Sequence, residues 1–113
     1  MIYFDNAATT IPYAEVLRTY QEVSSKIFGN PSSLHNLGIN AMKQIILARG
    51  AIADSLGVDK DEIIFTSGAT EANNMALFGA AKAKKRLGNR IVTTAIEHES
   101  VLESAKELEK QGF

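Results

Sequence analysis

Cysteine is absent from the 113 residues of this sequence. Its absence excludes disulfide bonds, thiolate metal sites and any cysteine nucleophile supplied by this chain. Long apolar runs are missing too, and residues 1–5 lack the basic region and apolar core of a secretory signal. We therefore expect a cytoplasmic location and no membrane partner.

An excess of charge is also lacking, since the formal net charge is −1. Nucleic-acid binding needs a clustered basic face, which a near-neutral chain does not supply. The one basic cluster, residues 82–86, falls at the end of an expected helix, where cations complement the helix dipole. With 45% hydrophobic and 22% charged residues, the composition is that of one globular unit that does not bind nucleic acid.

Apolar periodicity predicts four helices and two short buried strands. The helices are expected at about 12–27, 37–56, 70–84 and 100–110, and the strands at 62–66 and 90–95. The third helix has a small-residue face that would let it lie close against a sheet, formed by Ala72, Ala76, Gly79 and Ala83. Ser100 and Glu103 predict a capping box for the last helix, whose apolar face is Val101, Ala105 and Leu108. Alternating strands and helices predict an α/β fold: a partial three-layer parallel sheet with covering helices. Because two parallel strands do not make a stable sheet, we expect the N-terminal portion of a larger domain.

Residues 65–74 form the most informative stretch, in which an apolar segment enters a small-residue turn and then a helix. The first-turn N–H groups of such a helix have no intrahelical partner and lie at the positive end of its dipole. The turn therefore predicts a site for a phosphate or carboxylate, with Thr70 adding a hydroxyl donor. Glu71 would repel that anion, so its side chain should point away from the ligand or meet a cation. The alternative is a turn that only starts a helix.

Four segments, taken together, resemble a known family. They are YFDNAATT at 3–10, FGNPSSLH at 28–35, FTSGATE at 65–71 and IEHESVL at 96–102. Their order and spacing are similar to the N-terminal portion of the cysteine desulfurases, NifS/IscS-like enzymes of the class V aminotransferase family. These are pyridoxal-phosphate-dependent enzymes of fold type I.

The resemblance implies the aminotransferase-like fold, in which pyridoxal 5'-phosphate lies between two domains at a homodimer interface. Residues 1–30 then form an N-terminal arm and first helix, and 31–113 the start of the large cofactor-binding domain, which is incomplete. By the resemblance, Ala69 and Thr70 bind the cofactor phosphate. His98 stacks on the pyridine ring and assists proton transfer, so it is both a catalytic and a cofactor-binding candidate. No metal ligands are implied.

The chemistry of imidazole suits that role, because the ring is flat and exchanges protons near neutral pH. His98 also follows an expected strand end, where parallel-sheet proteins place ligands. A capping or loop histidine is the alternative reading of His98. His35 lies in the shared turn and is assigned no role, while Asn6 to Thr9 resemble an arm near the active site.

The resemblance predicts the N-terminal segment of an enzyme that converts L-cysteine to L-alanine and passes sulfur to an enzyme cysteine as a persulfide. In the family, the Schiff-base lysine and that cysteine lie beyond the position of Phe113. The segment alone is therefore expected to be inactive, with a homodimer or a complementing C-terminal chain and a sulfur-acceptor protein as partners.

Two alternatives stay open at this point. One is another enzyme of the same fold, such as a selenocysteine lyase or an aminotransferase. The other is a non-enzymatic assembly module completed by a partner chain. The residues do not distinguish iron–sulfur cluster assembly from tRNA thiolation as the destination of the sulfur.

Overall fold

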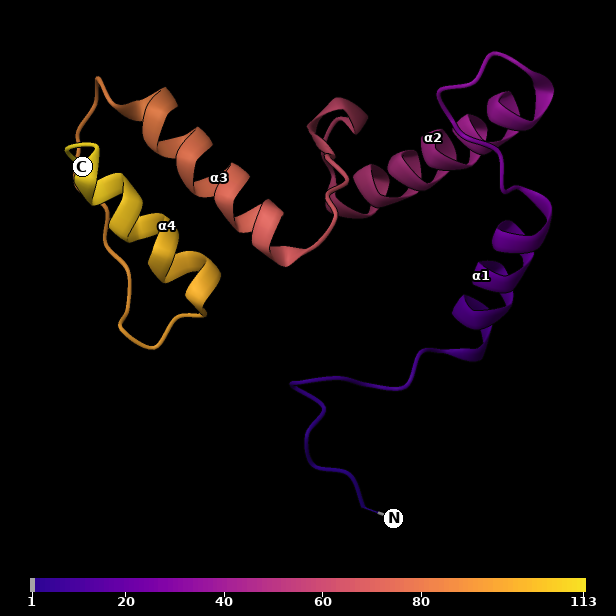
Figure 1. Cartoon of the computed structure of the whole chain (residues 1–113), viewed down its shortest axis with the longest axis horizontal. Helices are drawn as coiled ribbons and strands as arrows, with labels where there is room; N and C mark the ends of the chain where they lie inside the picture. The colour runs from indigo at the N-terminus through magenta and orange to yellow at the C-terminus, as the bar shows by residue number, and fades with distance from the viewer. Residues whose placement is uncertain (1) are drawn as a thin grey trace. The chain divides into compact units, whose positions relative to one another are not determined.

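The computed structural model describes residues 2–113, and its regular structure is entirely helical. The elements in chain order are α1 (Ala14–Lys26), α2 (Asn36–Leu56), the 3-10 helix η1 (Lys60–Glu62), α3 (Ala69–Lys84) and α4 (Glu99–Lys110) (Figure 1). They fall into two compact units that divide between Ile63 and Ile64. Whether residues 1–30 and 31–113 belong to different domains of a longer protein stays a prediction.

The predicted partial parallel sheet is wrong for this chain, because no strand is present in residues 2–113. A strand exists only where a neighbouring backbone accepts and donates its ladder hydrogen bonds. The two expected strands, 62–66 and 90–95, find no such neighbour within the described chain. The first is not buried either, since Ile64 is 62% and Phe65 47% exposed.

Local capping explains why the segment expected as the first strand begins in a helical turn. Asp59 and Glu62 form a capping box around η1: the Asp59 carboxylate accepts from the Asp61 N–H at 2.9 Å, and the Glu62 carboxylate accepts from the Asp59 N–H at 2.9 Å. Glu62 therefore ends a helical turn rather than starting a strand. Downstream, the Ile63 carbonyl accepts a hydrogen bond from Arg49 Nε of α2 at 3.2 Å.

In the first unit, α2 matches its prediction closely. It ends at Leu56, and Gly57 provides the left-handed C-cap with φ of 67°. Gly38, in the first turn of α2, is required by close approach: a Cβ there would collide with the carbonyl oxygens of Ser33 and Asn30. α1 begins after Tyr13, one residue beyond Pro12, and contacts no other helix of the described chain.

The second unit is a pair of helices lying side by side, α3 and α4, which start at the same end and run in the same direction (Figure 1). At their C-terminal ends, Lys85 Nζ lies 5.0 Å from the centroid of the Phe113 ring, and Asn89 Nδ2 donates to the Gly112 carbonyl at 3.3 Å. Leu108 of α4 is fully buried. The expected apolar face of the last helix, with Leu108 at its centre, is thus confirmed.

The small-residue face of α3 is not the one that packs in this unit. Its members, Ala72, Ala76, Gly79 and Ala83, are exposed. The half-buried positions are Asn73, Asn74, Leu77, Phe78 and Ala81. The small face was expected to lie against a sheet, and without strands in residues 2–113 it has no surface to cover.

Candidate functional site

The turn before α3 presents free backbone donors, as its sequence predicts. Gly68 is the N-cap, and the first intrahelical bond runs from the Ala72 N–H to the Gly68 carbonyl at 3.1 Å. The N–H groups of the three preceding helical residues, 69–71, therefore have no partner within the helix. No side chain caps them, so they remain available to an anion.

The Glu71 carboxylate is turned away from those donors. Its Oε2 accepts hydrogen bonds from the Ser67 N–H at 2.6 Å and from the Ser67 hydroxyl at 2.8 Å. These bonds, the backbone one first, lower the pKa of the Glu71 carboxyl below its ordinary value. Glu71 therefore bonds to Ser67 and not to the N–H groups of residues 69–71, and its orientation relative to a bound anion stays a prediction.

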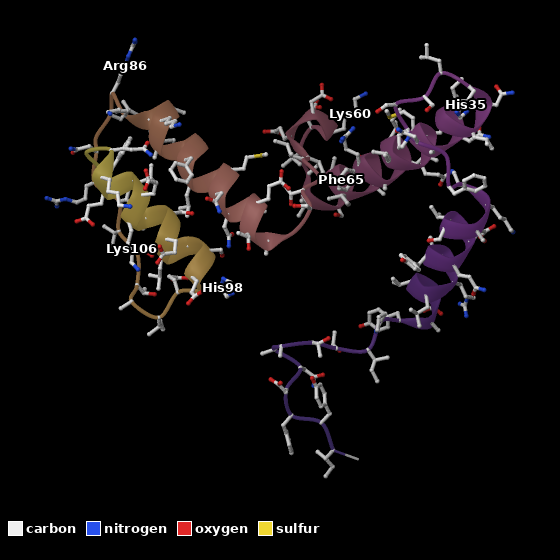
Figure 2. All side chains as sticks on the ribbon, viewed as in Figure 1. His35, Lys60, Phe65, Arg86, His98 and Lys106 are labelled. Carbon is white, nitrogen blue, oxygen red and sulfur yellow. The ribbon has the colours of Figure 1, made fainter. Side chains whose placement is uncertain are left out.

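His98 is the N-cap of α4, as Figure 2 illustrates at the start of that helix. Its Nδ1 accepts from the Ser100 N–H at 3.2 Å and lies 2.9 Å from the Ser100 hydroxyl oxygen. Ser100 was expected to be the cap, with Glu103 completing a capping box, and that expectation is wrong. Histidine ranks below serine among cap formers, so sequence preference alone selected the wrong residue.

Two polar bridges join the first turns of α3 and α4. Asn73 Nδ2 donates to the Ser100 hydroxyl oxygen at 2.8 Å. The Ser104 hydroxyl oxygen lies 3.1 Å from Asn74 Oδ1 and 2.7 Å from the Ser100 carbonyl oxygen, and these two acceptors share its single hydrogen. Asn74 Nδ2 in turn donates to the Thr70 carbonyl at 2.8 Å. The bridges therefore tie the backbone next to Thr70 to the turn that His98 caps.

An open groove of about 380 Å³ runs between these two helices. Its walls are Thr70, Asn74 and Phe78 from α3, and His98, Glu99, Ser100, Glu103, Ser104 and Glu107 from α4 and its cap. Two predicted site residues, Thr70 and His98, thus line one groove although they lie on different elements. The third, Ala69, is adjacent to Thr70 in the first turn but does not line the groove.

Charge changes along the groove. Two helix N-termini, with their positive dipole ends, meet at the Thr70 and His98 end. Toward the other end, Glu103 pairs with Lys106 at 2.6 Å, and Glu107 pairs with Lys110 at 3.2 Å. The hydrogen bond that Lys106 donates to Glu103 raises the pKa of Lys106, and the hydrogen bonds that Gln111 and Lys110 donate to Glu107 lower the pKa of Glu107. The helix dipoles therefore favour an anion at the N-terminal end, where the acidic lining residue Glu99 opposes it.

Sequence reasoning missed the asparagines and serines of the two bridges as a group. A signal for them existed: Ser100 and Ser104 are spaced i, i+4, and both are buried polar residues on the apolar side of α4. Asn73 and Asn74 are likewise polar positions on the half-buried side of α3. A polar pair that interrupts an apolar face calls for a partner on the facing helix.

The remaining predicted features belong to the first unit. His35 is the N-cap of α2, where its Nδ1 accepts from the Gly38 N–H at 3.3 Å (Figure 2). This contact is a structural role for a residue to which the sequence assigned none. Asn6 to Thr9 are exposed, with a turn closed by the Ala8 N–H on the Asp5 carbonyl at 3.1 Å.

Residues 2–113 contain neither a metal-binding cluster nor a membrane-spanning helix. No group of three or more histidine, cysteine, aspartate or glutamate residues there is placed to hold a metal ion. No helix within the same range has the length and apolar character that crossing a bilayer requires.

Comparison with known proteins places the whole described chain in context. The profile of the family described as aminotransferase class-V matches residues 2–113. A NifS/IcsS protein homolog of Lactobacillus delbrueckii subsp. bulgaricus is 52% identical over 113 residues, all of this chain and 29% of the relative. The cysteine desulfurase IscS of Clostridium botulinum (strain Kyoto / Type A2) is 46% identical over 112 residues, 99% of this chain and 28% of the relative.

A solved structure is also similar to this chain in its backbone. The protein described as SspA in complex with cysteine superposes with a TM-score of 0.82 at 40% identity, over 98% of this chain and 32% of that one. This chain therefore spans less than a third of the length of the proteins that it matches.

Proposed function

The chain belongs to the class-V aminotransferase family, and from this premise we propose that it is the N-terminal part of a pyridoxal-phosphate-dependent cysteine desulfurase. The observation that carries the proposal is the groove in which Thr70 and His98 come together. The name of the Clostridium botulinum relative supports the reaction, and the cysteine complex of SspA supports L-cysteine as the substrate.

The donor set of the α3 turn fits a phosphate group. Unpartnered N–H groups at residues 69–71 and the Thr70 hydroxyl are the donors that a phosphate dianion requires. The Glu71 carboxylate bonds to Ser67 and therefore leaves the N–H groups of residues 69–71 to such a ligand. Ala69 and Thr70 would therefore hold the cofactor phosphate, with Ala69 contributing only its backbone.

When bound, pyridoxal 5'-phosphate supplies an electron sink for carbanion chemistry at the amino acid. His98 would cover one face of the cofactor ring, because its imidazole lies on the same groove as Thr70. The Asn73 and Asn74 bridges would keep the two residues in register. Formation of the persulfide requires a cysteine, and this chain contains none. That step belongs to residues outside it.

The remaining parts of the proposal follow from the family. The Schiff-base lysine and the cysteine would come from a C-terminal part or a complementing C-terminal chain, because this chain contains no cysteine. The complete enzyme would be a homodimer, and a sulfur-acceptor protein would receive the sulfur. The cytoplasmic location stays a prediction. The 113-residue chain supplied with pyridoxal 5'-phosphate and L-cysteine should form no alanine, and release of alanine or sulfide would contradict this.

Titration with 4-deoxypyridoxine 5'-phosphate tests the phosphate site, since this analogue has no aldehyde to react with lysines. Backbone amide NMR signals of Ala69, Thr70 and Glu71 should shift saturably. Thr70→Val should weaken binding roughly ten- to hundredfold, because a hydrogen bond to a charged group is worth about 1.5–3 kcal/mol. The matched control ligand is 4-deoxypyridoxine, which lacks the phosphate. Equal shifts with both ligands, or none at residues 69–71, would overturn the assignment.

A further inference from the structure

Both histidines of the chain are helix N-caps, but they differ in one donor. Nδ1 of His35 accepts from a backbone N–H alone, that of Gly38 at 3.3 Å. Nδ1 of His98 has two neighbouring donors on one residue, the N–H of Ser100 at 3.2 Å and its hydroxyl at 2.9 Å. His35 therefore serves as an internal comparison for His98, because its Nδ1 has one neighbouring donor and that of His98 has two.

The direction of the hydroxyl bond follows from its surroundings. A backbone N–H can only donate, so the N–H of Ser100 requires a lone pair on Nδ1. The Ser100 hydroxyl oxygen already accepts from Asn73 Nδ2 at 2.8 Å. Because Nδ1 accepts from the Ser100 N–H and carries no proton, its contact with the Ser100 hydroxyl is made by the hydroxyl hydrogen. Ser100 is only 8% exposed, so solvent has little access to compete for these bonds.

We propose that Asn73 and Ser100 are positioning residues that hold neutral His98 in the tautomer protonated at Nε2. Two donors on Nδ1 exclude a proton there, and the chain Asn73 amide, Ser100 hydroxyl, His98 ring has one consistent direction. Nε2 makes no hydrogen bond within residues 2–113. Nε2 is therefore the ring nitrogen that can hydrogen-bond to a ligand in the groove.

This tautomer decides what His98 can do chemically. A neutral imidazole with its proton on Nε2 donates a hydrogen bond at that atom and cannot accept a proton there without first releasing the one it holds. His98 would therefore offer a donor to an electron-rich acceptor atom of a ligand in the groove. This chemical consequence rests on the proposed function, whereas the tautomer itself can be measured without any ligand.

The second bridge provides the matched control. Asn74 and Ser104 join the same two helices a turn away, and neither contacts the His98 ring. Asn74→Ala loosens the helix pair without removing a donor from Nδ1. Ser100→Ala removes the hydroxyl but leaves the backbone cap. Asn73→Asp replaces the amide donor by an acceptor of the same shape, which should draw the hydroxyl hydrogen away from the ring.

The experiment is a long-range proton–nitrogen correlation spectrum of the ¹⁵N-labelled full chain at alkaline pH, where imidazole is neutral. In the unmodified chain, His98 should show an unprotonated signal for Nδ1 and a protonated one for Nε2, while His35 shows more tautomer averaging. Ser100→Ala and Asn73→Asp should both shift the His98 signals toward averaged values. Asn74→Ala should leave them unchanged, and Ser100→Thr, which keeps a hydroxyl, should restore them.

Several results would overturn the proposal. They are a protonated Nδ1 in the unmodified chain, His98 signals unaffected by Ser100→Ala and Asn73→Asp, or an equal effect of Asn74→Ala. Helix content by circular dichroism identifies any variant that fails to fold, and the remaining variants then decide. Failure of the phosphate titration with the tautomer intact would remove the proposed function alone. Normal ligand binding with an averaging His98 would remove this inference alone.

Discussion

Glu71 is an acidic residue in the first turn of α3 whose carboxylate bonds outside that turn. Its Oε2 accepts from the N–H and the hydroxyl of Ser67 at 2.6 and 2.8 Å. A carboxylate in the first turn still benefits from the helix dipole. The closure therefore keeps a favourable charge near the helix start while clearing the backbone donors.

Acidification should open this closure. Because the folded-state pKa of Glu71 is lowered, the stabilising contribution is present above the ordinary glutamate pKa and is lost as pH falls through the lowered value. The Glu71 carboxyl carbon, followed by NMR against pH, should titrate below the usual glutamate range. Ser67→Ala removes the hydroxyl donor and should raise this pKa part of the way to normal.

Thr66→Ala is the matched control for that titration. Thr66 donates to the Gly68 carbonyl at 3.2 Å and makes no bond to Glu71, so the Glu71 pKa should be unchanged in the variant. An unshifted pKa in the unmodified chain, or equal effects of the two substitutions, would show that Ser67 is not the cause.

The same scale shows what sequence could and could not reveal about the site. Thr70 and His98 could be selected from the sequence because each lies in a segment with a recognisable pattern. The capping role of His98 could not be predicted, because capping preferences favour Ser100, two residues later. The Asn73–Ser100 bond joins residues that are distant in sequence, and only the packing of α3 on α4 brings them together.

At the scale of elements, α2 contains two glycines with opposite requirements. A Cβ on Gly38 would collide with backbone carbonyls, whereas a Cβ on Gly50 would meet nothing within 4 Å. Gly38 therefore fixes the entry of the chain into the helix, and Gly50 only weakens the helix interior by its backbone freedom.

Alanine should act in opposite directions at these positions. Gly38→Ala should destabilise the chain by about 1–3 kcal/mol, the usual range for overpacking. Gly50→Ala should stabilise it by about 0.5–1 kcal/mol, because alanine is the better helix former. Urea unfolding followed by helix ellipticity measures both. A stabilising Gly38→Ala would mean that the turn at 30–33 moves freely away from α2.

The helices could be predicted and the strands could not, because the two elements depend on hydrogen bonds of different sequence separation. The bounds of α2 follow from periodicity and from Gly57, all within its own sequence, and α3 similarly follows from its turn. A strand at 62–66 depends on a neighbouring strand that is distant in sequence. The capping box of Asp59 and Glu62 forms between residues close in sequence, and it places Glu62 in η1 instead. The hydrogen bonds within the helices are made by residues close in sequence, whereas the ladder partners that strands at 62–66 and 90–95 would need are absent from residues 2–113.

At the scale of the molecule, the chain buries little of its apolar content. Only Ala41, Ala53 and Leu108 are buried hydrophobic residues among those described, while side chains as large as Phe4, Leu34 and Ile96 are more than 90% exposed. Apolar exposure of this extent marks an interaction surface or an aggregation hazard.

The isolated chain should therefore bind a hydrophobic dye and associate as its concentration rises. Fluorescence of 8-anilinonaphthalene-sulfonate should increase on mixing with chain in buffer and fall again in concentrated urea, and light scattering should report species above the 12.2 kDa monomer. A monomer with a cooperative thermal transition and no dye signal would contradict this exposure.

The boundary between Ile63 and Ile64 leaves all tyrosine chromophores of the chain in the first unit. All three tyrosines, Tyr3, Tyr13 and Tyr20, precede that boundary, and tryptophan is absent. Ultraviolet absorbance near 280 nm and intrinsic emission therefore come from the first unit alone. The candidate site lies in the optically silent unit, so a single tryptophan at exposed Leu87 would give it a reporter away from the groove.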